Sequence, residues 1–406
     1  MARIPCDEHR DDVTALLAGR FREQLRDLDH TLRGRVLAQD ARARINVPAW
    51  SNSQMDGFAV RTADLSATGR TSLPVGDPIP AGAAPGELPD GSARPIMTGA
   101  PLPHGADAVV PIEETAERSF DLAAVTLEPA GASPGRFVRA TGSDTSAGDV
   151  IARLGDVLTP ARIGHMISCG IAQVAVRERP RALVISTGSE VTAPGQPLPD
   201  GGVYDANGPA VAGALEEAGA DVVDVLRVGD APGALSAAIR AALRTAAETS
   251  GSIDLVVSSG GVSAGAYEPV RQAAADDGVQ LVFPKVAIQP GGPQGIGTID
   301  GVAWVALPGN PVSALLSVEL FLRPALGAAP RLTMRAPLRL EADEPSPGHL
   351  EQYRRAWLLP SGEARLAGGP SSHLLGALAQ ANALVRIPVG VERLRDGDTV
   401  DVILLQ

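Results

Sequence analysis

Short apolar runs alternate with amphipathic segments over residues 177–328 of this 406-residue chain. Strands are predicted at 181–187, 220–228, 254–261 and 302–308, and helices at 207–219, 232–245 and 313–326. Strands that alternate with helices favour a parallel sheet with helices on both faces. Ligands of such sheets bind beyond the carboxyl ends of the strands, so we expect the loops 186–190, 258–265 and 307–313 to lie side by side.

The chain before residue 177 has a different pattern. Apolar residues recur at helical spacing from Asp7 to His30, which predicts one or two amphipathic helices, and a short helical piece is expected over Thr31–Asp40. Thr159 and Pro160 form a cap and first-turn pair that opens a predicted helix ending near Cys169. Between these helices the chain is dense in Pro and Gly with short apolar pairs, a composition typical of a small all-β module.

After Pro330 short strands return, separated by turn residues, and predict a small β-barrel. The chain is too long for one core, its length predicts two to four domains, and the patterns above divide it into four. They are a discontinuous helical N-terminal domain (1–46 plus 143–176), an inserted β-rich domain (47–142), a three-layer α/β domain (177–328) and a C-terminal β-barrel (329–406). The fold class is therefore multidomain α/β.

Charge and composition limit the classes of binding partner and the expected location of the protein. The formal net charge of −12 argues against nonspecific binding to nucleic acid or to an anionic membrane. No run of eighteen apolar residues occurs and the N-terminus lacks a signal-peptide core, so a cytoplasmic location is expected. Cys6 and Cys169 are too few for a disulfide framework or a zinc site. Since Lys285 is the sole lysine, a phosphorylated ligand must be held by local dipoles and a few placed cations.

The stretch 254–270 offers such dipoles. Leu255 to Val257 predict a buried strand, and Gly260 and Gly261 then allow a sharp turn that aims successive N–H groups at one point. A helix expected from about Tyr267 would add its N-terminal dipole. An ordinary strand-to-helix turn is the alternative interpretation.

A second glycine-bearing loop follows the strand at 302–308. Asn310 is a strong helix cap, Pro311 suits the first helical turn, and Gly309 lets the backbone approach a ligand. A good cap would explain these residues by itself, but it would not explain two such loops at neighbouring strand ends. Asp56, which precedes Gly57 at the mouth of another predicted strand, is either a functional carboxylate or part of a turn.

Seven stretches together resemble one family, the molybdopterin molybdenumtransferases of MoeA type, which include the E domain of gephyrin. They are SNSQMDGFAV (51–60), PIMTGAPLPHGADAVV (95–110), STGSEV (186–191), YDANG (204–208), DLVVSSGGVSAG (254–265), ALPGNPVSALLSVELFLRPAL (306–326) and ANALVRIP (381–388). The resemblance implies a homodimer with an α/β domain like that of the molybdopterin-adenylylating enzymes, and an adenylyltransferase as a further partner.

The resemblance also implies a transferase reaction of molybdenum cofactor biosynthesis. Molybdate is delivered to the dithiolene of adenylylated molybdopterin, AMP is released, and Mg²⁺ assists. The implied catalytic residues are Asp56, Asp144, Glu190, Asp230 and Glu268, with Glu190 and Asp230 as metal ligands. The implied binding residues are Thr98, Thr187, Gly188, Asp205, Asn207, Ser259, Gly260, Gly261, Val262, Ser263, Lys285, Pro308, Gly309, Asn310, Pro311 and Ser313.

The chain departs from the family pattern at three places. Ser189 stands where the family usually has Asp in TGDE, and Ala266 stands where an acidic residue is frequent. The usual KPGKP reads QPGGP at 289–293, so two cations are missing, and charge-assisted contacts are roughly twice as strong as neutral ones. Lys285 compensates in part if strand alternation puts it on the same side as Gln289.

These departures leave two alternatives to an active insertase. One is a divergent paralogue that binds molybdopterin species with weak or no turnover. The other is a dimeric scaffold for protein interaction.

Overall fold

The structure is a computed structural model that describes residues 3–20, 22–66, 69–82, 84–127, 133–249, 251–263 and 268–405. The chain divides into two compact units, which are described separately. Unit 1 comprises Met1–Gln24, Gly34–Val36 and Arg177–Gln406, and unit 2 comprises Leu25–Arg33 and Leu37–Val176. The four-domain division expected from the sequence stays a prediction.

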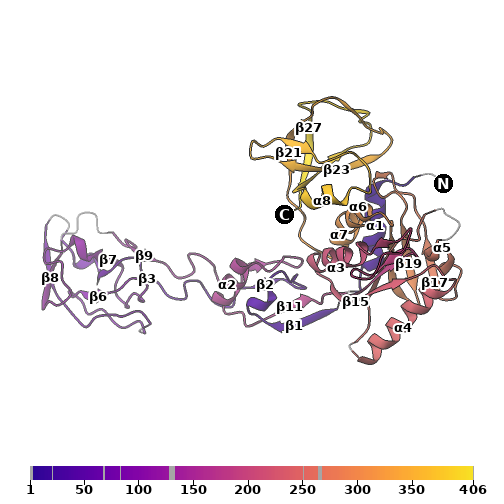
Figure 1. Cartoon of the computed structure of the whole chain (residues 1–406). Coiled ribbons are helices and arrows are strands. Elements are labelled where there is room, and N and C mark those ends of the chain that lie inside the picture. The colour runs from indigo at the N-terminus through magenta and orange to yellow at the C-terminus, as the bar shows by residue number, and fades with distance from the viewer. Residues whose placement is uncertain are drawn as a thin grey trace. The chain divides into compact units, whose positions relative to one another are not determined.

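Unit 1 is built on a six-stranded sheet with the order β15-β12-β16-β20-β19-β17. Figure 1 labels β15, β19 and β17 of this sheet. The four predicted strands form its parallel part: β12 (Arg181–Thr187), β15 (Asp221–Val228), β16 (Leu255–Ser259) and β20 (Val302–Leu307). Two strands that were not predicted, β19 (Gly295–Ile299) and β17 (Val279–Val282), extend it in antiparallel orientation. The turn between β19 and β20 is Asp300-Gly301, both with positive φ (47° and 81°), as tight hairpin turns require. The sheet is therefore mixed.

Alternate residues of the central strands face opposite layers. Leu183, Val256 and Trp304 pack towards the residues of α4 (Ala234–Thr249) and α5 (Pro269–Ala273). Val184, Val257 and Val305 pack towards α1 (Cys6–Leu17), α3 (Asn207–Glu217) and α6 (Pro311–Ser317). Because both faces are covered, the strands are apolar throughout rather than alternating. The predicted three-layer α/β architecture is confirmed.

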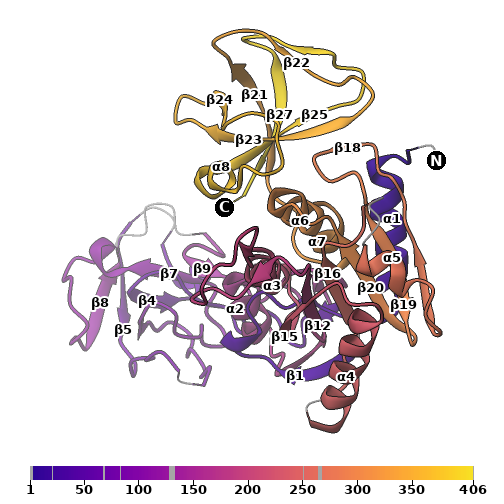
Figure 2. The same ribbon diagram turned by 45° about the vertical axis from the view of Figure 1, so that its right-hand side comes forward.

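A closed β-barrel forms the C-terminal part of unit 1 (Figure 2). Its strands pair in the order β23-β24-β21-β27-β25, and β25 pairs back to β23. The bounds are β21 (Thr333–Arg339), β23 (Glu351–Leu358), β24 (Ala364–Leu366), β25 (Ala383–Ile387) and β27 (Thr399–Leu404). The short strand β18 (Ile288–Gln289) joins the edge of β23, and α8 (Leu375–Gln380) precedes β25. The predicted barrel is confirmed.

The helical prediction for the N-terminal region holds only for α1. Gly19 has a φ of +72° just after this helix. The helix expected over Thr31–Asp40 is wrong: Asp29 accepts a hydrogen bond from Thr31 N and opens a single turn, His30–Leu32, and Gly34 with a φ of +80° follows. Local side-chain bonds and a glycine therefore outweigh the apolar spacing.

Unit 2 contains one longer helix, α2 (Pro160–Ser168), in its described part, and several small sheets. The hydroxyl of Thr159 accepts from Arg162 N and caps α2 as predicted. The β-rich module is organised around β4 (Gly57–Val60), which pairs with both β6 (Arg94–Ile96) and β7 (Ala108–Pro111). The remaining strands of unit 2 are β1 (Glu23–Asp27), β2 (Ala41–Arg42), β3 (Asn52–Ser53), β5 (Thr71–Pro74), β8 (Ala124–Leu127), β9 (Val138–Arg139), β10 (Val150–Ala152) and β11 (Gln173–Arg177).

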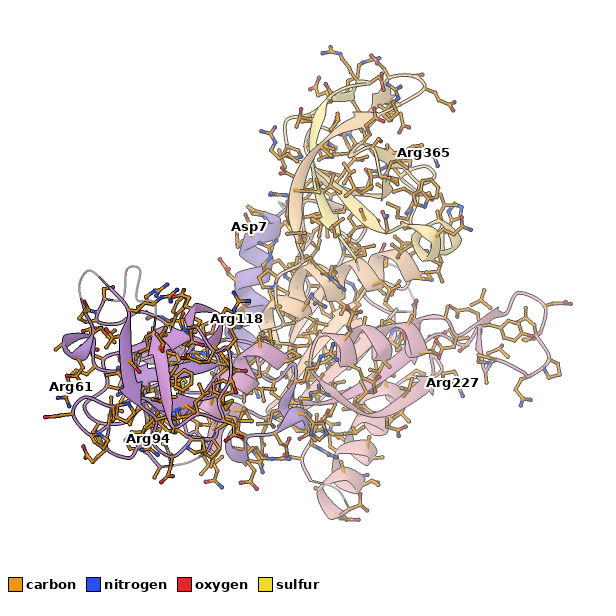
Figure 3. All side chains as sticks on the ribbon, turned by 90° about the vertical axis from the view of Figure 1, so that its left-hand side faces the viewer. Asp7, Arg61, Arg94, Arg118, Arg227 and Arg365 are labelled. Atoms are coloured by element: carbon orange, nitrogen blue, oxygen red, sulfur yellow. The ribbon has the colours of Figure 1, made fainter. Side chains whose placement is uncertain are left out.

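Arginines tie the loops of this module together (Figure 3). Arg61 pairs with Asp90 and donates to Gly105 O, and Arg94 donates to Asp77 O and Glu87 O. Such contacts hold irregular backbone where regular sheet hydrogen bonds are missing. No helix in the described residues is long and apolar enough to cross a bilayer.

Candidate functional site

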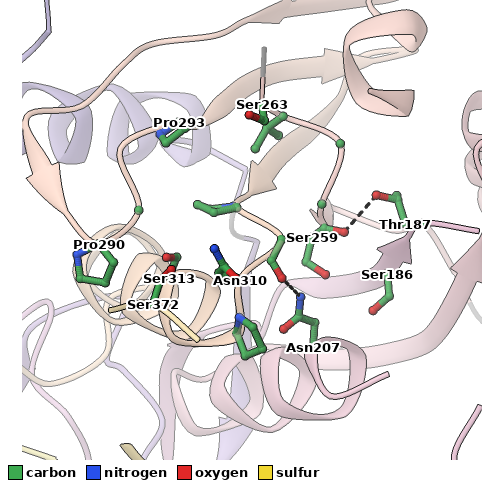
Figure 4. Close-up of a pocket in the computed structure, with 18 of the residues that line it drawn as sticks. Ser186, Thr187, Asn207, Ser259, Ser263, Pro290, Pro293, Asn310, Ser313 and Ser372 are labelled. Atoms are coloured by element: carbon green, nitrogen blue, oxygen red, sulfur yellow. Dashed lines mark hydrogen bonds between the residues drawn. The ribbon is translucent and has the colours of Figure 1, made fainter. Parts of the chain in front are cut away.

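The three glycine-bearing loops of unit 1 lie next to one another at the carboxyl ends of β12, β16 and β20, as expected (Figure 4). Thr187 Oγ1 donates to Ser259 O at 3.1 Å, and Gly260 N donates to Leu307 O at 3.1 Å. Asn207 Nδ2 donates to Gly309 O at 2.7 Å. The loops therefore form one connected rim at the edge of the sheet.

Two glycines in this rim are required by the backbone. Gly260 has a φ of +90°, and a Cβ there would lie 2.6 Å from Thr187 Oγ1 and 2.9 Å from Thr187 O. Gly261 has a φ of +70°, and its Cβ would lie 2.9 Å from Pro269 Cγ. A side chain at either position would push neighbouring segments apart. The cradle predicted from the sequence thus has the close backbone approach that only glycine permits.

A pocket of about 1060 Å³ opens beside this rim. Most of the residues expected from the sequence line it: Thr187, Gly188, Glu190, Asp205, Asn207, Asp230, Ser259, Gly260, Gly261, Val262, Ser263, Glu268, Lys285, Pro308, Gly309, Asn310, Pro311 and Ser313. Asp56, Thr98 and Asp144 belong to unit 2 and are not part of this lining. The structure brings the first group together, and their roles stay predictions.

Other lining residues were not expected as binding residues. They are Arg3, Ser186, Val191, Val203, Tyr204, Ala206, Pro269, Ile288, Gln289, Pro290, Gly291, Gly292, Pro293, Leu350, Pro370, Ser371 and Ser372. Val191 and Val203 pair in the small strands β13 (Val191–Thr192) and β14 (Val203–Tyr204). The segment 289–293 could have been found from its likeness to KPGKP. Arg3 and the barrel residues 370–372 reach the pocket only through the tertiary fold.

Ser189 and Asp230 hold each other at the ends of β12 and β15. Ser189 N donates to Asp230 Oδ2 at 2.9 Å, and Asp230 N donates to Ser189 Oγ at 3.0 Å. Ser189 therefore fixes the orientation of the neighbouring carboxylate from the position where the family usually has Asp. Glu190 also faces this corner, because its carboxylate lies against Gly188.

Asp205 is a buried carboxylate at the start of α3. Its Oδ1 accepts from Ser186 Oγ at 2.8 Å and from Gly208 N at 2.9 Å. Its Oδ2 lies 3.8 Å from Arg227 Nη1 and accepts no hydrogen bond in the part of the chain that is described. Asn207 Oδ1 is likewise buried without a hydrogen-bond donor among the described residues. Both acceptor atoms are buried behind the pocket surface, and Arg227 supplies the charge that faces Asp205 Oδ2.

The helices beside the pocket differ from the expectation. The helix expected from about Tyr267 begins at Pro269 and has only five residues, and Tyr267 lies outside the described residues. One loop amide, Ser263 N, already donates to Glu268 Oε2 at 3.1 Å. So short a helix adds little dipole, and the loop amides of the rim are the main donors.

The helical run after the third loop is longer. α6 continues through one wider turn, Val318–Leu322, into α7 (Arg323–Ala325). Asn310 precedes α6 with extended backbone, but its side chain makes no capping hydrogen bond. Capping therefore does not account for this asparagine, which lies on the pocket wall instead.

Lys285 and Gln289 both line the pocket, but they do not share one unbroken strand. Lys285 makes an isolated bridge to Pro293, whereas Gln289 belongs to β18 and pairs with β23. Strand alternation therefore does not place Lys285 and Gln289 on the same side. The fold of the loop 286–293 brings the two side chains to the same pocket instead.

Asp56 and Thr98 form a contact of their own in unit 2. Thr98 N and Thr98 Oγ1 both donate to Asp56 Oδ1, at 2.6 and 2.8 Å. The backbone hydrogen bond, followed by the hydroxyl bond, lowers the pKa of Asp56 below its usual value. Asp144 lies on an exposed turn where its backbone N donates to Val47 O at 3.0 Å. In this structure Thr98 therefore donates two hydrogen bonds to Asp56 and lowers its pKa.

Three family models together match nearly the whole chain. They are the MoeA N-terminal region (domains I and II) at residues 4–170, the probable molybdopterin binding domain at 183–328, and the MoeA C-terminal region (domain IV) at 337–405. The second and third models fall inside unit 1 and agree with the separation of its sheet and barrel, whereas the first covers most of unit 2 together with the N-terminal segment that belongs to unit 1.

Relatives cover the same length. Molybdopterin molybdenumtransferase 2 of Mycobacterium tuberculosis is 41% identical over 387 residues, covering 91% of this chain and 92% of its own. Molybdopterin molybdenumtransferase 1 of the same organism is 34% identical over 407 residues, with 92% of each chain covered. The crystal structure of a MoeA molybdopterin biosynthesis protein from Pyrococcus horikoshii superposes with a TM-score of 0.81 at 28% identity and 100% coverage of both chains. The chain therefore belongs to the MoeA family of molybdopterin molybdenumtransferases, which are transferases of molybdenum cofactor biosynthesis.

Proposed function

We propose that this protein transfers molybdenum from molybdate to the dithiolene of adenylylated molybdopterin and releases AMP. The observation that supports this most is the convergence of three loops, at the ends of β12, β16 and β20, on one polar pocket. A pocket of about 1060 Å³ is at the upper end of the range for small ligands, as a pterin joined to a nucleotide requires.

The chemistry of the lining fits such a ligand. The backbone N–H of Gly261, in the turn that follows Gly260, is proposed as a donor to a phosphate, since the N–H of Gly260 is taken by Leu307 O. Asp205 and Asn207 line the pocket with a carboxylate and an amide, which are side chains of the kind that accept from the N–H groups of a heterocyclic ring.

Glu190 and Asp230 are proposed to bind Mg²⁺. The described residues include no group of three or more His, Cys, Asp and Glu side chains arranged for a metal, so the protein offers at most two carboxylates here. That fits Mg²⁺, which usually binds one or two carboxylates together with waters and substrate phosphates. When bound, the ion would polarise the phosphate and offset negative charge as AMP departs. Ser189 keeps the carboxylate of Asp230 oriented for this role.

The residues of unit 2 are assigned by resemblance alone. Asp56 and Asp144 position the metal or the molybdate, and the lowered pKa keeps Asp56 ionised for that role. Thr98 is proposed to act through its two hydrogen bonds to Asp56. The homodimer, the adenylyltransferase partner and the cytoplasmic location expected from the sequence are retained as part of this proposal.

One observation favours a second candidate, a paralogue that binds molybdopterin species with weak turnover. The loop 289–293 has no cation of its own, so substrate phosphates or molybdate lose contacts that charged residues would make. This candidate differs from the first in turnover rather than in binding.

A reconstituted reaction separates the two. Purified protein is mixed with adenylylated molybdopterin, molybdate and Mg²⁺, and AMP release and active cofactor are measured together. Release of AMP that depends on molybdate supports the insertase. Tight binding of adenylylated molybdopterin without AMP release would refute the insertase and leave the paralogue. The absence of any binding would leave only a scaffold role.

A further inference from the structure

The pocket has an unfavourable charge balance for an anionic ligand. Its charged lining residues in the described structure are four carboxylates (Glu190, Asp205, Asp230 and Glu268) and two cations (Arg3 and Lys285). A phosphate or a similar oxyanion is repelled near the carboxylates, so it must be held where the cations are. Both cations lie at the segments that flank the loop 289–293.

The N-terminal segment is tied to this loop by backbone pairing. Ile4 N donates to Lys285 O at 3.0 Å, and Ala287 N donates to Ile4 O at 2.8 Å. Residues 285–287 also pair with the end of the loop 289–293, because Val286 N donates to Gly292 O at 2.8 Å. The residue that precedes Ile4, Arg3, is therefore held at the pocket by the fold.

Gly292 and Arg3 share one space. Arg3 Nη1 donates to Val286 O at 3.1 Å, and a Cβ on Gly292 would lie 3.1 Å from that same nitrogen. A side chain at position 292 would thus compete with the guanidinium. Guanidinium has five N–H donors, and the described structure assigns one of them, so the exposed group keeps donors for a ligand.

We propose that Arg3 is an oxyanion-binding residue of this pocket and supplies, together with Lys285, the cationic contact that the loop 289–293 lacks. The ligand group is a tetrahedral oxyanion, either the phosphate of the adenylylated substrate or molybdate. This inference rests on the proposed function, which it extends by naming the residue that makes up for the missing charges. The guanidinium fork suits two oxygens of one anion.

Binding measurements with Arg3→Gln test the proposal. AMP and molybdate serve as separate probes, each titrated by calorimetry at low and high salt. Arg3→Gln should weaken at least one probe about tenfold and flatten its salt dependence, because one charge-assisted contact is lost. Arg3→Lys should keep part of the affinity. The probe that loses affinity identifies the oxyanion.

Arg20→Gln is the matched control. Arg20 lies just after α1, as Arg3 lies just before it, and donates to a backbone carbonyl, Gly301 O, at 2.8 Å, but it does not line the pocket. It should bind both probes as the wild type does. If Arg3→Gln binds both probes as tightly as Arg20→Gln with the same salt dependence, the proposal is overturned. Wild-type protein that binds neither probe would overturn it as well.

Moving the cation gives a second test. Gly292→Lys in the wild type should add little affinity, because Arg3 already occupies that space, whereas in the Arg3→Gln background it should restore most of the loss. Equal gains in both backgrounds would contradict a shared space. These readouts need no turnover, so a protein that binds oxyanions but releases no AMP would fail the proposed function while leaving Arg3 in its role.

Discussion

Replacing Gly260 with alanine is expected to weaken nucleotide binding about ten- to hundredfold at little cost to the fold. The new Cβ would lie 2.6 Å from Thr187 Oγ1 and 2.9 Å from Thr187 O. Thr187 must then move away from Ser259, whose carbonyl it now contacts, and the rim of amides opens. A φ of +90° adds roughly 1–2 kcal/mol of backbone strain for any side chain.

Gly219→Ala separates strain from the steric effect. Gly219 has a φ of +96°, but a Cβ there meets nothing within 4 Å, and it lies after α3 rather than at the pocket. Both variants should lose a few degrees in melting temperature, since about 1 kcal/mol corresponds to roughly 2–4 °C in a large domain.

Only the Gly260→Ala variant should lose affinity for AMP, measured by calorimetry. The loss of a hydrogen bond to a charged group costs roughly 1.5–3 kcal/mol, which raises the dissociation constant about ten- to hundredfold. If Gly260→Ala binds AMP like Gly219→Ala, the loop does not contact the phosphate and the reasoning fails.

Three further outcomes are expected. Ser189→Ala should weaken Mg²⁺ binding severalfold in a titration of AMP release, because Ser189 Oγ accepts from Asp230 N and holds the backbone that carries this carboxylate, and Ser189→Asp should strengthen it by adding a carboxylate; identical Mg²⁺ curves would contradict this role. Trp304→Phe should lower the unfolding free energy in urea by roughly 1–3 kcal/mol, because the indole N–H donates to the buried Ser258 Oγ at 2.9 Å, and adding Ser258→Ala should recover part of the loss. Burial lowers the pKa of His9 from 6.5 to about 4, so the unfolded chain binds more protons than the folded chain between these pH values. The free energy of unfolding should therefore decrease as the pH is lowered from about 6.5 towards 4, by at most about 1.4 kcal/mol per pH unit. His9→Phe should reduce that slope, and an unchanged slope would mean that other groups cause it.

The local order of strands and helices in the α/β domain followed from the sequence alone. Strands buried on both faces need unbroken apolar runs, and such runs mark β12, β16 and β20 without any knowledge of their neighbours. The glycines after their ends, Gly188, the pair Gly260-Gly261 and Gly309, were equally visible. The antiparallel strand β19 also had a local signal, the Asp300-Gly301 turn, which the alternation of strands and helices obscured.

Local patterns misled where short-range polar bonds competed with spacing. Leu32 and Leu37, in the segment where a short helix was expected, are both buried. The Asp29 side chain nevertheless opens only a single turn, and Gly34 with its positive φ follows that turn. Apolar spacing indicates which residues are buried, but it does not by itself indicate their secondary structure.

The tertiary structure alone decided which distant residues complete the pocket. Ser189 and Asp230 are 41 residues apart and meet because β12 and β15 are adjacent and parallel. Arg3 reaches Val286 across 283 residues through pairing of the N-terminal segment, and Ser372 arrives from the barrel. Sequence determines side-chain chemistry and local backbone, whereas the meeting of such residues depends on strand order and domain packing, which no local pattern encodes.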